Sequence, residues 1–441
     1  MNVDIWLTRG NQTALLQKQT DTLTFSEAKA SYPTIQIAGE KTYQSMDGFG
    51  FALTGGSAHL INRLDPTARD ALLRELFSTE EEAIGISYLR ISMGASDLST
   101  HSFSYDDLPQ GQIDPELERF NLDAGDVEVI PVLRQILAIN PGITIMATPW
   151  SAPPWMKTNQ SFIGGELKPE YYPVYARYFV RYLEAMRECG ITVHALSPQN
   201  EPLNLKNEPS MVMPAEDQAT FIKNHLGPAL QAAGLQVEIF CWDHNCDVID
   251  YPLTVLADDA ARQYISGVAW HLYGGEIEAL SAVQALYPDK KMVFTEQWVG
   301  RDGHFDGDLN WHARHVLIGA TRNWSRLVLE WNLASDPDCG PHTAGGEPNC
   351  VGALTVDDAV TRNVAYYIVA HAAKFVPPGS MRIESTFLNS LPNVAFKRPD
   401  GGTVLIVLND GAENLAFNIE YNEKWVSTSL DSGALATYIW R

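Results

Sequence analysis

The sequence has 441 residues, of which 45% are hydrophobic and 19% are charged, a composition typical of a globular protein with a sizeable core. Acidic residues outnumber basic ones by 54 to 31, and the net charge of −23 argues against nucleic acid as a partner, because nucleic-acid binding needs a basic patch. No apolar run of the sequence reaches the roughly 18 residues of a transmembrane helix, so we expect no membrane span.

The N-terminal segment 1–19 lacks the basic and apolar regions of a signal peptide. We therefore expect a cytoplasmic protein, or a secreted or periplasmic one if a signal has been removed. Five cysteines are an odd and low count, so disulfides are not expected to form the framework. Cys339 and Cys350 flank a Gly- and Pro-rich loop and could pair in a secreted protein, a question that the sequence leaves open.

Residues 1–45 contain short β-like runs, such as TLTF and TIQIAG. From residue 46 onward a different pattern repeats, in which an apolar run is followed by a polar Gly- and Pro-rich loop and then by helical periodicity. The apolar runs are nearly continuous, as in parallel strands that are covered on both faces. They predict strands at 46–53, 86–94, 143–150, 193–200, 237–245, 266–274, 291–298 and 326–334. Apolar spacings of three and four predict helices between them, for example at 66–78 and 173–190.

Eight strand–helix units predict an α/β fold, a (β/α)8 TIM barrel over residues 46–376. Over residues 377–441, apolar and polar residues alternate between turn signals such as PDGG and NDG, a pattern typical of antiparallel strands. We expect residues 1–45 to pair with these C-terminal strands. Both termini would then form one β-sandwich-like domain attached to the barrel.

Catalytic groups of TIM barrels lie at the C-terminal ends of the strands. In this sequence Glu201 and Glu296 end two apolar runs, where an unpaired buried charge would be costly. Two carboxyls across a barrel mouth can hydrolyse a glycoside, one as acid and one as nucleophile, with retention at a separation of roughly 5–5.5 Å. Aromatic residues at strand ends suit the apolar faces of sugars. These aromatic residues are Trp150, Tyr273, Trp298 and Trp331.

Other interpretations apply to some of these acids. Taken alone, Glu201 could be a solvated turn residue, and Glu330 is expected to be structural because it points away from its strand neighbour Trp331. The segment CWDHNC (241–246) lacks a second ligand pair with zinc-type spacing, so we expect no metal site. Asp243 and His244 are expected to form hydrogen bonds beneath the site.

Five motifs in chain order, MDGFG, TPWSAPPWMKTN, PQNEP, FTEQW and EWNLA, resemble the family 30 glycoside hydrolases, which include acid β-glucosidase (glucosylceramidase) and the β-1,6-glucanases. The resemblance extends from about residue 46 to the C-terminus. It implies a barrel with an adjacent β domain, and a retaining mechanism through a covalent glycosyl-enzyme that needs no cofactor and no metal.

The resemblance implies that Glu201 is the general acid/base and Glu296 the nucleophile. We expect the pKa of Glu201 to be raised by burial and by the charge of Glu296, because an acid catalyst must hold a proton. Arg90 would orient the carboxylates near the nucleophile. The residues expected to contact the substrate, by resemblance or by their place at strand ends and in loops, are Asp97, Trp150, Asn200, His271, Tyr273, Trp298, Trp331 and His342. For His271, a hydrogen-bonded position without sugar contact is an equal alternative.

We therefore expect a retaining hydrolase of β-D-glucosides, either a glucosylceramidase-like β-glucosidase or a β-1,6-glucanase, with a carbohydrate as its partner. Gln297 and Trp298 follow the expected nucleophile where glucosylceramidases of vertebrate type carry small residues, which favours an oligosaccharide over ceramide. His342 in a Gly-rich loop also favours an oligosaccharide over a lipid. The alternatives are a β-xylosidase or β-fucosidase, a transglycosylase, and a non-catalytic carbohydrate-binding barrel. The sequence leaves open exo or endo action, the linkage and the oligomeric state.

Overall fold

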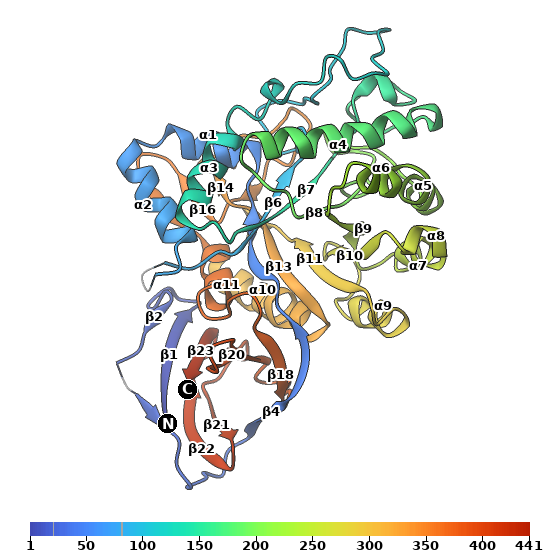
Figure 1. The fold of residues 1–441 in the computed structure, drawn as a ribbon. Coiled ribbons are helices and arrows are strands. Elements are labelled where there is room, and N and C mark those ends of the chain that lie inside the picture. The colour runs from blue at the N-terminus through green and yellow to red at the C-terminus, as the bar shows by residue number, and fades with distance from the viewer. Residues whose placement is uncertain (21, 81–82) are drawn as a thin grey trace.

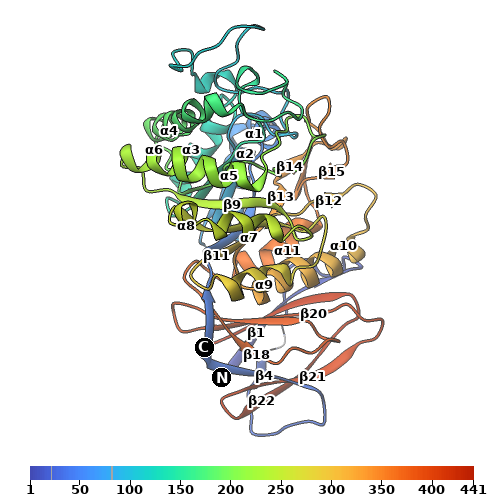
Figure 2. The same cartoon turned by 90° about the vertical axis from the view of Figure 1, so that its right-hand side faces the viewer.

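The computed structural model describes residues 1–20, 22–80 and 83–441. Figure 1 shows a barrel surrounded by helices and, beneath it, a β domain that carries both chain termini. The blue N-terminal strands lie beside the red C-terminal strands in this domain. The same two-part arrangement is seen from the side in Figure 2.

In the described part of the chain, eight parallel strands close into a barrel in the order β5, β6, β7, β8, β9, β10, β11 and β13. Their bounds are Gly48–Ala52, Tyr88–Ser92, Thr144–Thr148, Ala195–Leu196, Glu238–Asn245, Ile265–His271, Lys291–Glu296 and Ser325–Asn332. Each lies within one of the eight expected apolar runs or overlaps it. The predicted TIM barrel is therefore confirmed. Its interior is filled by side chains from alternate strand positions, among them Met146, Phe240 and Leu327.

The helices follow the strands and cover the outside of the barrel (Figure 1). Those of the first half are α1 (Gly55–Arg63), α2 (Pro66–Phe77), α3 (Val129–Ile139) and α4 (Tyr172–Glu188), with short 3-10 turns at Leu122–Ala124, Pro154–Met156 and Pro169–Tyr171. Those of the second half are α5 (Ala215–Phe221), η4 (Ile222–Leu226), α6 (Gly227–Ala232), α7 (Asp250–Ala257), α8 (Asp259–Arg262), α9 (Ala279–Leu286), α10 (Phe305–His312), η5 (Ala313–Ala320) and α11 (Val364–Ala373), of which η4 and η5 are π-helical.

Local sequence sets the ends of these helices. The carboxylate of Asp65 accepts hydrogen bonds from two amides of the first turn of α2, and Pro66 occupies the first helical position. The helix α4 ends just before Gly190, which has a φ of +82°, a left-handed conformation that glycine adopts without strain. Gly190 is the stop signal that the sequence indicates.

Strand β8 is much shorter than predicted. The sequence favours a strand over 193–200, whereas the structure has only Ala195–Leu196. The amide of Ser197 still donates to the carbonyl of Ala147 at 3.3 Å. Beyond it the backbone leaves the ladder, because Pro198 has no amide hydrogen to donate. The amide of Asn200 instead donates to the carbonyl of Pro149, at 2.8 Å. The end of β8 is thus a bent segment that carries Glu201.

The β domain is built from both ends of the chain. The N-terminal strand β1 (Asn2–Arg9) pairs antiparallel with β23 (Ala434–Trp440), and β4 (Thr34–Ser45) pairs with β18 (Met381–Ser385) and with β21 (Leu415–Tyr421). The predicted domain from both termini is therefore confirmed. The remaining strands of its sheet are β2 (Gln17–Lys18), β3 (Leu23–Thr24), β19 (Asn393–Lys397), β20 (Thr403–Asn409) and β22 (Lys424–Leu430).

Strand β20 shows how the two parts are joined. Val404, Ile406 and Leu408 belong to the large hydrophobic core of the barrel, whereas Leu405 and Val407 belong to the core of the β domain. Successive side chains of a strand point to opposite faces, so one strand serves both cores. The two parts are packed through a continuous apolar core.

Short strands join the loops at the carboxyl end of the barrel. These are β12 (Val299–Gly300), which pairs with β15 (Cys350–Val351), and the small sheet of β14 (Ala334–Ser335), β16 (Leu354–Val356) and β17 (Val360–Arg362). All five cysteines are free thiols, so Cys339 and Cys350 are not bridged in this structure. Among the described residues, none of the helices is long and apolar enough to cross a membrane.

Candidate active site

A cavity of about 270 Å³ lies in the mouth of the barrel, at the carboxyl ends of the strands. This volume is near the lower end of the range for ligand pockets. The lining residues are Asp97, Trp150, Glu201, Asn204, Asn207, His244, Asn245, Tyr273, Glu296, Trp298, Trp331 and Glu347. A larger hollow, of about 590 Å³, lies on the β domain around Trp425, but none of the described residues that line it carries a carboxylate. The cavity in the barrel is therefore the candidate active site.

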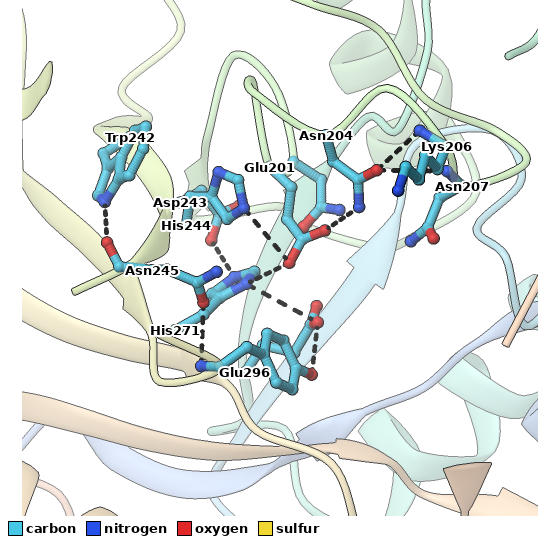
Figure 3. Close-up of polar contacts among 12 residues, drawn as sticks. Glu201, Asn204, Lys206, Asn207, Trp242, Asp243, His244, Asn245, His271 and Glu296 are labelled. Atoms are coloured by element: carbon cyan, nitrogen blue, oxygen red, sulfur yellow. Dashed lines mark hydrogen bonds and ion pairs between the residues drawn. The ribbon is translucent and has the colours of Figure 1, made fainter. Parts of the chain in front are cut away.

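Glu201 lies in the bent segment after β8, where its φ of +43° is uncommon for a residue other than glycine. Its amide donates to the carbonyl of Asp243 at 3.0 Å, which fixes this conformation. Its Oε2 accepts a hydrogen bond from Nδ2 of Asn204 at 2.7 Å, and its Oε1 lies 3.3 Å from Nδ1 of His271 (Figure 3). Such strain at a residue with fixed neighbours is typical of functional sites.

Glu296 is the last residue of β11 and faces Glu201 across the cavity. Its Oε2 accepts a hydrogen bond from Nη1 of Arg90 at 2.5 Å, and its Oε1 accepts one from the hydroxyl of Tyr273 at 2.9 Å. One carboxylate oxygen of Glu201, one of Glu296 and a ring nitrogen of His271 all lie within 4.8 Å of one another. The two carboxylates thus approach each other around a shared histidine.

Beneath the two glutamates, Arg90 and Asp243 form a fully buried ion pair at 2.8 Å. The same Nη2 of Arg90 also donates to Oδ1 of Asn200, at 2.7 Å. Asp243 also accepts hydrogen bonds from the hydroxyls of Ser197, at 2.5 Å, and Thr295, at 2.7 Å. Buried charges need such partners because an unpaired one is strongly destabilising. This buried layer holds Glu296 and His271 in place.

The buried cluster of Glu201, Asp243, His271 and Glu296 has pKa values that differ from the expectation drawn from the sequence. Burial alone would lower the pKa of His271, but Glu296, Asp243 and Glu201 together raise it to about 9. Burial would raise the pKa of Glu201, but the hydrogen bond from His271 and the charges of His244 and His271 lower it to about 2. The expected raised pKa of Glu201 was therefore wrong. These opposite pKa shifts favour a proton on His271, whose two ring nitrogens both lie beside carboxylates.

The pKa of Glu296 is raised by burial, against the opposing charges of His271 and Arg90. Burial and the charges of Glu296 and Glu201 also raise the pKa of Asp97 to about 8. Asp97 is therefore largely protonated at neutral pH. A protonated carboxyl can donate as well as accept a hydrogen bond, which suits a sugar hydroxyl.

Aromatic rings form the deep wall of the cavity. Trp150 and Trp331 stack with their ring centroids 5.3 Å apart, and the guanidinium of Arg90 lies 4.9 Å from the ring centre of Trp150. Trp298 packs against this pair from the loop after β11. The wall combines apolar ring faces with a fixed positive charge behind them.

The structure brings most of the predicted site residues together. Seven of them line the cavity, namely Asp97, Trp150, Glu201, Tyr273, Glu296, Trp298 and Trp331. Four others lie in the buried layer that supports the cavity, namely Arg90, Asn200, Asp243 and His271. His342 does not line the cavity, and its Nδ1 lies 2.7 Å from the carbonyl of Thr343. Glu330 is buried against His312 at 2.8 Å, which agrees with a structural role.

His244 was expected beneath the site, but it lines the cavity. Sequence reasoning missed four further residues of the lining. Asn204 and Asn207 lie in the loop that begins at Glu201, and Asn245 is the last residue of β9. The rule that barrel sites collect at strand ends could have found these three. Glu347 lies in the long loop between β14 and β15, and only the folded loop brings it to the cavity.

Among the described residues, Glu201, His271 and Glu296 are the group whose ligand atoms converge closely enough for a metal ion. Arg90 already neutralises Glu296, and both ring nitrogens of His271 face carboxylates. Hydrogen bonds and ion pairs within the protein thus engage these groups. The arrangement fits paired acid and nucleophile chemistry better than metal ligation.

Comparison with known proteins agrees with this geometry. Residues 46–376 match the glycosyl hydrolase family 30 TIM-barrel domain, and residues 379–438 match the glycosyl hydrolase family 30 beta sandwich domain. The chain is 34% identical over 386 residues to an endo-1,6-beta-D-glucanase of Neurospora crassa, covering 83% of this chain and 79% of the relative. It is 30% identical over 442 residues to the lysosomal acid glucosylceramidase of Mus musculus, covering 92% and 83%.

A solved endo-beta1,6-glucanase structure superposes on the whole chain with a TM-score of 0.92 at 35% identity, and 99% of that structure is covered. SrfJ of Salmonella typhimurium superposes with a TM-score of 0.93 at 28% identity, with 100% of both chains covered. The resemblance inferred from the five motifs is confirmed. The chain belongs to glycosyl hydrolase family 30 and is a glycosidase.

Proposed function

We propose that the protein is a retaining endo-β-1,6-glucanase in which Glu296 is the nucleophile and Glu201 the general acid/base. The observation that carries the chemistry is the pair of carboxylates with oxygens within 4.8 Å of each other, close to the roughly 5–5.5 Å that double displacement requires. An inverting mechanism would need a wider gap, with room for a water molecule between the sugar and the base.

In the first step, Glu296 attacks C1 of the glucosyl unit and the glycosidic bond breaks. Arg90 and the hydroxyl of Tyr273 hold the two oxygens of Glu296 and so direct the carboxylate at the sugar. Glu201 protonates the leaving oxygen. In the second step Glu201 removes a proton from water, which releases the sugar from Glu296 with its configuration retained.

The proton for the first step comes from His271, whose Nδ1 lies 3.3 Å from Oε1 of Glu201. As Glu296 becomes an ester it loses its negative charge, and this charge is the largest of the factors that raise the pKa of His271. His271 therefore releases its proton through Glu201 when the nucleophile is consumed. The net charge of the buried cluster is unchanged, which avoids the cost of a new unpaired charge.

The leaving group is placed beside Glu201, because the acid must reach the glycosidic oxygen. This side of the cavity is lined by Asn204, Asn207, His244 and Asn245. Amide and imidazole groups bind hydroxyl groups by hydrogen bonds and gain nothing from lipid chains. Together with the identity to endo-1,6-glucanases, this lining supports a sugar as the leaving group.

Glucosylceramide hydrolysis is the second candidate. Leu203 and Leu205, on the same loop as Glu201, expose 41% and 59% of their surface. Two exposed leucines at the rim could contact an acyl chain. The 30% identity to the mouse glucosylceramidase also supports this candidate.

Parallel assays on pustulan, a linear β-1,6-glucan, and on glucosylceramide in detergent micelles separate the two candidates. We expect pustulan to be the better substrate and its early products to be short β-1,6-linked oligosaccharides. Glucose as the first product would indicate exo action, and a preference for glucosylceramide would reject the glucanase assignment. Proton NMR of the first product should show the β-anomer, and an initial α-anomer would reject the retaining mechanism.

A further inference from the structure

His244 lines the cavity beside Glu201 but has no part in the two steps of the proposed mechanism. Its Nε2 lies 3.8 Å from Oε1 of Glu201, a distance that is too long for a direct hydrogen bond (Figure 3). Among the described residues, no group forms a hydrogen bond with the other ring nitrogen, Nδ1, which is buried. Nε2 is therefore the atom of this ring that can reach a substrate.

A β-bulge aims His244 at the cavity. In the pairing of β9 with β10 the register shifts between Trp242 and His244, so Asp243 is an extra residue. Trp242 and Asp243 have φ values of +74° and +63°, which are uncommon for residues other than glycine. Successive side chains of a regular strand point to opposite faces. The bulge breaks this alternation, so that Asp243 reaches Arg90 beneath the site while His244 lines the cavity.

The ring of His244 is neutral and is held by its neighbours. Its centroid lies 5.0 Å from that of the Trp242 ring. Burial lowers the pKa of His244, against the negative charge of Glu201, which raises it. A neutral ring carries one proton, and the nearby carboxylate of Glu201 favours this proton on Nε2. His244 therefore presents an N–H donor on the side of Glu201.

Of the two oxygens of Glu201, Oε1 is the one better placed to carry the catalytic proton. Oε2 accepts a hydrogen bond from Nδ2 of Asn204 at 2.7 Å. This amide is fixed in orientation, because its Oδ1 accepts the backbone amides of Lys206 at 2.9 Å and of Asn207 at 3.3 Å. Oε1 faces Nδ1 of His271, the source of the proton in the proposed mechanism. The glycosidic oxygen must therefore come within hydrogen-bond reach of Oε1.

A single oxygen atom can be held by Glu201 and His244 together. Hydrogen bonds of about 2.7–3.0 Å from each side span the 3.8 Å between Oε1 and Nε2. The leaving oxygen of the first step meets this position. The water of the second step takes the same position, because at Glu201 the second step is the reverse of the first. Nε2 then donates to a lone pair of this oxygen while Oε1 gives or takes its proton.

We propose that His244 is a catalytic residue that donates a hydrogen bond from Nε2 to the oxygen atom exchanged at Glu201. This atom is the glycosidic oxygen in the first step, and the oxygen of water or of an acceptor sugar in the second. In the second step an O–H bond of water breaks and its proton goes to Oε1, the water oxygen bonds to C1, and the bond between C1 and Glu296 breaks. The inference deepens the proposed function and rests on it.

The test follows release of 2,4-dinitrophenol from its β-glucoside. This leaving group needs no proton, so the glycosyl-enzyme forms rapidly and its reaction with water limits kcat, which gives a burst of dinitrophenol. The side chain of His244→Asn is too short to place a donor at the position of Nε2. A neutral hydrogen bond contributes roughly 2- to 10-fold. We expect kcat to fall about 10-fold and kcat/KM less than threefold, with a burst at least as large as in the wild type.

His244→Gln is the matched variant, because the amide nitrogen of glutamine can take the position of Nε2. It should keep kcat within threefold of wild type. The size of the burst counts the folded and active sites in each preparation, so a loss caused by misfolding is recognised. His101→Asn, at an exposed histidine, is the control and should leave kcat and kcat/KM unchanged.

The same comparison in Glu201→Ala separates direct contact from an effect through Glu201. This variant still forms the glycosyl-enzyme from the dinitrophenyl glucoside, and the slow hydrolysis of the intermediate can be followed. If His244 holds the water itself, adding His244→Asn should slow this hydrolysis at least threefold further. If His244 acts only through Glu201, the second substitution has no further effect.

Three results would overturn the role of His244: a wild-type kcat in His244→Asn, equal losses in the asparagine and glutamine variants, or no further slowing in Glu201→Ala. The proposed function is tested on the wild type alone. Wild-type enzyme that leaves pustulan intact would contradict the glucanase function, and one that forms no covalent adduct on Glu296, as measured by mass spectrometry, would contradict the mechanism. The failure of the inference and the failure of the function are therefore distinguishable.

Discussion

At the scale of single residues, the active site contains a buried set of charges that neutralise one another. Arg90 is completely buried and contacts Glu296, Asp243 and Asn200. Loss of one partner from such a set leaves an uncompensated buried charge and typically costs roughly 3–5 kcal/mol. Substitutions here must therefore be interpreted with a stability measurement beside the kinetic one.

Glu296→Ala should lower kcat by about 10⁴-fold or more, because the covalent route divides one difficult step into two easier ones. The matched control is Glu330→Gln. Glu330 is also buried near the carboxyl end of a barrel strand, but its side chain contacts His312 and does not reach the cavity. Both variants should be checked by circular dichroism for native folding. Turnover of Glu296→Ala within tenfold of wild type would reject Glu296 as the nucleophile.

Glu201→Ala should lose most of its activity on pustulan, yet retain far more on 2,4-dinitrophenyl β-glucoside, whose leaving group needs no proton. Azide should accelerate the variant on the activated substrate, because it can enter the space of the lost carboxylate and attack the glycosyl-enzyme. The product is a β-glucosyl azide, detectable by mass spectrometry. If azide yields no such product and both substrates are affected equally, Glu201 is not the acid/base.

The pH dependence of kcat/KM should show an alkaline limb near pH 9. The pKa of His271 is raised to about 9, so its proton is present below that pH and is lost above it, and the rate falls as the proton supply disappears. His271→Gln should remove this limb and reduce the rate more on pustulan than on the dinitrophenyl glucoside. An unchanged alkaline limb in His271→Gln would show that another group sets it.

At the scale of secondary-structure elements, α11 connects the barrel to the β domain through one histidine. The hydroxyl of Thr437 donates to the carbonyl of His371 and accepts from Nδ1 of the same residue at 2.8 Å. Thr8 of β1 accepts the amide of Leu16 and donates to Nε2 of His371 at 2.9 Å. This network suits a neutral His371 ring, with a proton on Nδ1 alone. A second proton, on Nε2, would find no free acceptor, because the hydroxyl of Thr8 already donates to Nε2. Burial accordingly lowers the pKa of His371 to about 3.

This lowered pKa predicts a specific loss of stability in acid. Between pH 6.5 and pH 3 the unfolded chain binds a proton at His371 that the folded chain does not, so the free energy of unfolding falls as the pH falls. From pH 7 to pH 5 the wild type should lose about 2 kcal/mol more than His371→Gln, as measured by urea unfolding. His101→Gln, at an exposed histidine, is the control. If the wild type and His371→Gln lose equal free energies of unfolding, the neutral state of His371 between the barrel and the β domain is contradicted.

Elements of the fold were predictable wherever a local pattern sufficed. The eight barrel strands follow from apolar runs, and the end of α4 follows from Gly190. Strand β8 was overestimated because the apolar run continues past Leu196, although Pro198 and the bonds of Asn200 and Glu201 to neighbouring strand ends divert the backbone. Those bonds form between distant segments, and a local pattern does not contain them.

At the scale of the whole molecule, the barrel and the β domain should unfold together. Val404, Ile406 and Leu408 of β20 lie in the core cluster of the barrel, so neither part can unfold without exposing the other. We expect one calorimetric transition for the whole chain. Ile406→Ala should lower its midpoint without splitting it, since a buried isoleucine-to-alanine change costs about 2–5 kcal/mol. Two resolved transitions would show that the domains are independent.

The sequence by itself determined the barrel, the β domain from both termini and the family, because these depend on periodicity and on motifs that are local in the chain. For the same reason it pointed to the two glutamates of the proposed mechanism. It also placed seven residues at the cavity through the rule that barrel sites lie at strand ends. Only the tertiary structure decided where the proton resides. Glu201, His271, Asp243 and Glu296 come from four different strands or loops, and the pKa of each depends on distances among all of them.

The same reason accounts for Glu347 and His342. Both lie in one loop whose sequence gives no periodicity, and its path is set by contacts with Glu208, Asp97 and β12. Those contacts bring Glu347 to the cavity and leave His342 against its own backbone. Local patterns specify strands, helices and strand ends, whereas the position of a long loop and the charge of a buried cluster are properties of the assembled fold.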